Sequence, residues 1–171
     1  MNNNEQQAQF ERLVTPHLDA AYNLARWLAG NDHDAEDIAQ EACVRAFRFV
    51  SGCRGSDGRA WLLAIVRNTA YSWLKKNRSQ PLISIDDDDC PEMEDQMDAA
   101  SSFHSSDTDA LRAALEALPL EFREALVLRE LEGLSYKEIA EVAEVPLGTV
   151  MSRLARARRQ LQGAFKRKGD S

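Results

Sequence analysis

An acidic segment divides this chain into two separate folding units. Residues 81–110 contain ten Asp and Glu and no Lys or Arg, whereas the whole chain of 171 residues has 28 acidic and 21 basic ones. The segment also holds two prolines and few large apolar side chains, so it cannot bury enough surface to offset the entropy lost on ordering. We therefore expect a flexible acidic linker at 81–110 between two domains, at 1–80 and 111–171.

Outside this linker the chain is slightly basic. Its net charge is +1 over residues 1–80 and +2 over residues 111–171. Residues 151–168 carry seven basic side chains and no acidic one, which is typical of a surface that binds phosphate. The alternative is a solvent-exposed helix face whose basic side chains bind no ligand.

Both domains show apolar residues every three or four positions, which predicts helices rather than strands. Pro16 marks an expected break within the first helix. Ser135 and Glu138 have the spacing of a capping box. The spacing predicts helices over 5–29, 32–50, 56–78, 109–118, 120–132, 135–143 and 148–165. The expected fold class is all-α: two small helical domains joined by the linker.

The last forty residues have the pattern of a helix-turn-helix. On a helical wheel, Val150, Leu154, Ala157 and Leu161 form one apolar stripe. The opposite face carries hydroxyl and guanidinium groups, namely those of Thr149, Ser152, Arg156 and Arg159, with Arg153 on the flank. Arginine can donate two hydrogen bonds to guanine, and hydroxyls reach phosphates or base edges, so this face suits the major groove of DNA. The alternative is a plain helical hairpin with basic residues for solubility.

The helix predicted over 56–78 also has a polar side. Asn68, Tyr71, Ser72 and Lys75 share one arc of the wheel. Amide, phenol, hydroxyl and ammonium groups suit the base edges, base faces and phosphates of single-stranded DNA. Trp61 intrudes on this arc, and it either packs in the core or stacks on a base.

These blocks of sequence resemble a known family. The stretch 118–161, with 34–48 and 59–76 before it, resembles bacterial RNA polymerase sigma factors of the extracytoplasmic-function (ECF) group. The resemblance covers about residues 5–78 and 108–163. It implies a factor that binds core RNA polymerase, recognises two promoter elements and helps to melt DNA. It also implies that the chain is not an enzyme.

The resemblance further implies a role for individual residues. Thr149, Ser152, Arg153 and Arg156 would read the −35 element, with Arg159 and Lys166 on phosphate. Arg54, Asn68, Tyr71, Ser72 and Lys75 would contact the melted −10 strand. Asp37, Gln40 and Glu41, which share one helix face by their spacing, would dock on the polymerase clamp. The segment 122–131 would hold the polymerase flap. An anti-sigma factor is a further implied partner.

Other classes of function have weaker support. A stand-alone helix-turn-helix regulator usually dimerises, and the chain has no clear dimerisation heptad. An adaptor that binds polymerase without DNA would not need the basic face of 151–168. Three scattered histidines, without a nucleophile beside them, argue against an enzyme.

Cofactors and membranes are also not expected. The three cysteines (Cys43, Cys53 and Cys90) lack CxxC spacing, so we expect neither a metal site nor another cofactor. Cys43 or Cys53 either packs as a small apolar group or senses oxidation. The longest apolar run has seven residues, and the polar start MNNNEQQAQ does not resemble a signal peptide. We therefore expect a cytoplasmic protein without membrane insertion.

Overall fold

The described part of the structure, a computed structural model, is helical throughout its regular elements. It covers residues 2–55, 57–77 and 105–169, without the side chains of 105–107 and 165–169. The elements are, in order, α1 (Asn3–Leu13), η1 (Thr15–His17), α2 (Leu18–Ala29), α3 (Asp32–Phe49), η2 (Val50–Gly52), α4 (Arg59–Asn77), α5 (Ser105–Ala117), α6 (Leu120–Leu126), η3 (Val127–Leu131), α7 (Tyr136–Ala143) and α8 (Leu147–Gly169). The predicted all-α class with two helical domains is confirmed.

The helix that follows the linker begins earlier than its spacing predicts. Helix α5 begins at Ser105, four residues before the helix expected over 109–118, and so extends into the range 81–110 assigned to the linker. The remaining linker residues 81–104 lie outside the described part of the chain. Serine and aspartate are favoured near helix N-termini, and the sequence SSDTD that opens α5 supplies both. A count of net charge does not detect this signal.

Local signals in the sequence set the ends of several helices. Pro16 lies in the short turn η1 between α1 and α2, as expected from its missing N–H. The Ser135 side chain accepts from the Glu138 N–H at 3.1 Å, and Glu138 Oε1 accepts from the Ser135 N–H at 3.0 Å, which confirms the capping box. The turn before α8 requires a left-handed residue, and Glu144 adopts it with φ 56°. This turn fixes the angle between α7 and α8.

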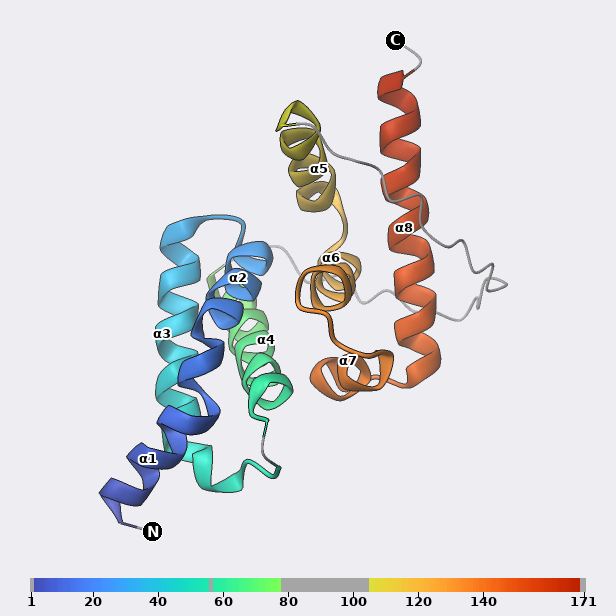
Figure 1. The fold of residues 1–171 in the computed structure, drawn as a ribbon. Coiled ribbons are helices and arrows are strands. Elements are labelled where there is room, and N and C mark those ends of the chain that lie inside the picture. The colour runs from blue at the N-terminus through green and yellow to red at the C-terminus, as the bar shows by residue number, and fades with distance from the viewer. Residues whose placement is uncertain (1, 56, 78–104, 170–171) are drawn as a thin grey trace.

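The two domains pack directly on each other. Figure 1 shows α1 to α4 as one group and α5 to α8 as a second group, with α6 and α7 facing α2 and α4. Buried side chains of both domains belong to one continuous hydrophobic cluster, for example Leu24 and Val66 from the first domain and Phe122 and Leu128 from the second. Helices α3 and α8 lie at opposite sides of the molecule (Figure 1). Among the described helices, none is both long enough and apolar enough to cross a bilayer.

Candidate DNA and polymerase interfaces

Helix α8 is held by the apolar stripe that the wheel predicted. Val150, Leu154 and Ala157 are fully buried, against α6 and α7. On the other side, Thr149, Arg153 and Arg156 are half-buried and Arg159 is exposed. The helix-turn-helix therefore presents Thr149, Arg156 and Arg159 away from its own core, as expected of a DNA-reading helix, whereas Arg153 lines a small hollow between α6, α7 and α8.

Ser152 does not lie where the wheel suggests. It points away from the apolar stripe, yet it is only 5% exposed, and its Oγ has no hydrogen-bond partner. A helical wheel gives the direction of a side chain but not what covers it. In this conformation the Ser152 hydroxyl is therefore not available to DNA.

Arg153 and Lys166 are two more of the residues predicted to contact the −35 element. Arg153 lies beside Glu121 of α6, where it lowers the pKa of that carboxyl against the larger upward effect of burial. Lys166 belongs to α8, but its side chain lies outside the described part of the structure. The neighbouring Arg158 donates to Glu130 at 2.9 Å, which ties α8 to η3 rather than leaving Arg158 to contact DNA.

The polar side of α4 is divided between solvent and the second domain. Ser72 and Lys75 are exposed, and so is Arg54 in the preceding loop, whereas Asn68 and Tyr71 are half-buried. Trp61 packs against the hydrophobic cluster, which favours the packing role over stacking on DNA.

Helix α6 covers part of this polar side with a buried carboxylate. Glu124 is 1% exposed, and it accepts from Arg67 Nε and from the Tyr71 hydroxyl, both at 2.7 Å. Burial and the Glu124 carboxylate raise the pKa of Tyr71, so its hydroxyl keeps its proton and donates. Sequence reasoning missed Glu124 and Arg67. The available signal was one acid next to the apolar run Ala125 to Leu128.

Helix α3 presents the predicted acidic face to solvent. Asp37, Gln40 and Glu41 are all exposed, and Glu41 also accepts from Arg45 at 2.7 Å within the helix. The exposed side chains of Val44 (59%) and Phe47 (36%) continue this face at the next helical turns. Phe47 packs one side of its ring on Phe10, with ring centroids 5.5 Å apart. The face thus combines carboxylates with an exposed valine and a partly exposed phenylalanine, which is typical of a docking surface.

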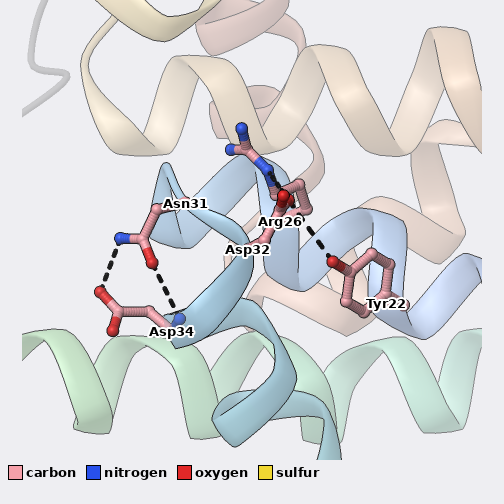
Figure 2. Close-up of polar contacts among 5 residues, drawn as sticks. All are labelled: Tyr22, Arg26, Asn31, Asp32 and Asp34. Carbon is pink, nitrogen blue, oxygen red and sulfur yellow. Dashed lines mark hydrogen bonds and ion pairs between the residues drawn. The ribbon is translucent and has the colours of Figure 1, made fainter.

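The start of α3 is fixed by contacts at its junction with α2. Asn31 caps the helix, because its Oδ1 accepts from the Asp34 N–H at 2.8 Å and its Nδ2 donates to Asp34 Oδ2 at 2.7 Å. Arg26 of α2 donates to Asp32 at 2.6 Å, and the Tyr22 hydroxyl lies 3.5 Å from the same oxygen (Figure 2). These contacts set where the first turn of α3 begins and so which way the Asp37 face points.

Both halves of the chain match models of the sigma-factor family. Sigma-70 region 2 matches residues 13–80, and Sigma-70, region 4 matches residues 108–161. The chain is also 34% identical over 151 residues to the ECF RNA polymerase sigma-E factor of Haemophilus influenzae, covering 81% of its own length and 77% of that protein. The chain belongs to the ECF family of RNA polymerase sigma factors. Sigma factors direct transcription initiation and catalyse no reaction themselves. The region 2 match accounts for the first domain, which a stand-alone helix-turn-helix regulator would not need.

Individual relatives agree with this assignment. This sigma factor is 38% identical over 154 residues to the ECF RNA polymerase sigma factor SigE of Mycolicibacterium smegmatis, covering 90% of its own length and 60% of that protein. It is 34% identical over 166 residues to the RNA polymerase sigma-H factor of Pseudomonas aeruginosa, covering 91% and 86% of the two chains. Its fold resembles the sigma factor RpoE of Bartonella quintana, solved in complex with the anti-sigma factor NepR, with a TM-score of 0.68, 28% identity, and 90% and 94% of the chains covered.

The two described cysteines of this sigma factor have the environment of packing residues. Cys53 is buried in the hydrophobic cluster, and Cys43 is half-buried. Burial raises the pKa of the Cys43 thiol, and burial together with the Asp57 carboxylate raises that of Cys53. Because the thiolate is the reactive form, these surroundings favour packing over oxidation sensing.

The unpartnered hydroxyl of Ser152 leads to a prediction about stability. We expect Ser152→Ala to raise the free energy of unfolding by about 1 kcal/mol, because it removes a buried polar group that makes no hydrogen bond. Urea denaturation followed by circular dichroism measures this change.

The matched control is Ser135→Ala, which removes a hydroxyl that does cap a helix. That change should lower the free energy of unfolding by about 1 kcal/mol. A similar loss from Ser152→Ala would show that the Ser152 hydroxyl is bonded after all.

Proposed function

We propose that this sigma factor binds core RNA polymerase through the exposed face of α3, reads the −10 strand with α4 and reads the −35 element with α8. The observation that supports this division is the placement of α3 and α8 on opposite sides of the molecule (Figure 1). One is acidic and partly apolar, and the other is basic. A protein surface and DNA can therefore be held at the same time.

The proposed polymerase contact rests on charge and on exposed apolar area. Asp37, Gln40 and Glu41 can accept hydrogen bonds from basic side chains of a partner. Val44 and Phe47 lie next to them and can be buried by the same contact. Apolar anchors surrounded by polar groups are a common arrangement in protein interfaces.

The proposed DNA contacts divide between base readout and phosphate binding. On α8, Thr149, Arg153 and Arg156 are assigned to the −35 bases, with Ser152 once it is uncovered. Arg159 and Lys166 are assigned to phosphates. For the −10 strand, the candidates are Arg54, Asn68, Tyr71, Ser72 and Lys75, with Asn68 offering an amide to the edge of an unstacked base.

The proposed surroundings follow from these partners. Core RNA polymerase and promoter DNA place the site of action in the cytoplasm. The sigma factor RpoE of Bartonella quintana was solved with an anti-sigma factor and aligns with 90% of this chain. We therefore include an anti-sigma factor among the proposed partners.

Reconstituted transcription tests the proposed function. The purified chain is added to core RNA polymerase on a library of promoter fragments, and the 5′ ends of the transcripts are mapped. We expect defined start sites that share two sequence elements upstream and that are absent with core polymerase alone. Identical start sites with and without the chain would contradict the proposal.

A second prediction separates base readout from phosphate binding on α8. Arg156→Ala should cost about 1–3 kcal/mol in binding by the holoenzyme and relax the preference at one −35 position, since a bidentate contact to guanine is lost. Competition between promoters that differ at single −35 positions measures both effects.

Lys166→Ala serves as the comparison, because it should weaken binding to all these promoters about equally. If Arg156→Ala also acts equally on every promoter, its assignment to a base is wrong.

A further inference from the structure

One polar contact joins the two domains beside the hydrophobic cluster that they share. It is the ion pair between Glu124 and Arg67, with the Tyr71 hydroxyl as a second donor. Both carboxylate oxygens of Glu124 are occupied, one by Arg67 Nε and the other by the Tyr71 hydroxyl. Glu124 is 1% exposed and the Arg67 side chain 15% exposed. Both hydrogen bonds of this second-domain carboxylate therefore come from α4 of the first domain.

The ion pair of Glu124 with Arg67 determines the relative orientation of the two domains more than it stabilises their contact. A buried ion pair loses hydration on both groups, and its attraction does little more than compensate for that loss. When the domains separate, water can hydrate both groups again. When the domains shift slightly, the carboxylate loses its partners while it is still buried. The contact therefore favours one closed arrangement and still allows full opening.

The two groups that donate to Glu124 lie on or beside the side of α4 assigned to the −10 strand. The Tyr71 hydroxyl is bound by Glu124, and the Arg67 guanidinium lies 3.9 Å from the centre of the Tyr71 ring. Arg67 Nη1 also donates to Asn68 Oδ1 at 3.3 Å. A guanidinium and a phenol that hold a carboxylate can hold a phosphate oxygen in the same way.

The closed arrangement also covers surface of the second domain. Phe122 and Leu128, in the segment expected to hold the polymerase flap, lie in the cluster shared with the first domain. Among the apolar side chains of this segment, only Leu131, at its end, is largely exposed, at 56%. The face of α3, in contrast, remains open to solvent.

We propose that Arg67 and Tyr71 form a phosphate-binding site for the −10 strand, and that Glu124 occupies this site in the free chain as an internal competitor. Arg67 and the role of Glu124 are additional to the contacts assigned above, and the site rests on the proposed function. Opening of the domains releases Arg67, Tyr71 and Asn68 together.

The test replaces the carboxylate by a cation. Glu124→Lys repels Arg67 and should open the full-length chain, which small-angle X-ray scattering detects as a larger radius of gyration. Binding of a fluorescent single-stranded −10 oligonucleotide should tighten about tenfold or more if nine-tenths of the wild-type chain is closed. Glu116→Lys, an exposed site on α5 with the same change of charge, is the control and should change neither the radius nor, beyond a small nonspecific gain, the affinity.

A second substitution in the open chain separates the two parts of the proposal. The double variant Arg67→Gln, Glu124→Lys has no ion pair to close it, so its radius of gyration should equal that of Glu124→Lys. It should nevertheless bind the oligonucleotide more weakly than Glu124→Lys, because the phosphate-binding guanidinium is gone. Equal oligonucleotide affinity in these two variants would exclude Arg67 from the DNA site.

The result that overturns the competitor role is a Glu124→Lys chain as compact as the wild type, with no gain in affinity over Glu116→Lys. If circular dichroism shows that Glu124→Lys is unfolded, scattering of the wild-type chain decides. It should expand when the −10 oligonucleotide is saturating, and an unchanged radius overturns the proposal. If the wild-type chain directs transcription but these tests fail, only the competitor role of Glu124 is wrong. If the chain does not direct transcription, the proposed function itself is contradicted.

Discussion

The arrangement of this sigma factor depends on where one carboxylate is buried. Each domain has few residues with which to build a core, and the helices of both contribute to one hydrophobic cluster. Apolar contact alone would allow several neighbouring orientations, because it has no direction. Glu124, with Arg67 and Tyr71 on its two oxygens, allows only one of them. The contact of Glu124 with α4 therefore selects one orientation of the two domains among those that the hydrophobic cluster alone would allow.

This arrangement separates the proposed interfaces by accessibility. The acidic and apolar face of α3 lies at the outer side of the molecule and is open (Figure 1). The side of α4 assigned to the −10 strand is partly covered by Glu124 of α6. In the proposed order of events, polymerase contacts the closed chain first, and the −10 strand is read once the domains have separated.

Local signals in the sequence predicted much of the fold, and contacts between distant residues account for what they missed. Pro16 and the Ser135–Glu138 box each act over a few residues, so their effect can be read directly from the sequence. The apolar stripe of α8 was also predictable, because burial of Val150, Leu154 and Ala157 follows from helical spacing. The burial of Glu124 was not, since it depends on a partner 57 positions away along the chain. The same limit applies to Ser152, whose direction was predicted but whose covering was not.

The face of α4 that contacts α6 in the free chain is proposed to contact DNA in the polymerase complex. Energy transfer between two dyes tests this exchange of partners most directly. The dyes would be placed at Glu36 on α3 and Gln160 on α8, both exposed, in a chain whose three cysteines are replaced. The account predicts one short distance in the free chain and a clearly longer one when the same chain is bound to core RNA polymerase on a promoter. An equal distance in both states would contradict it.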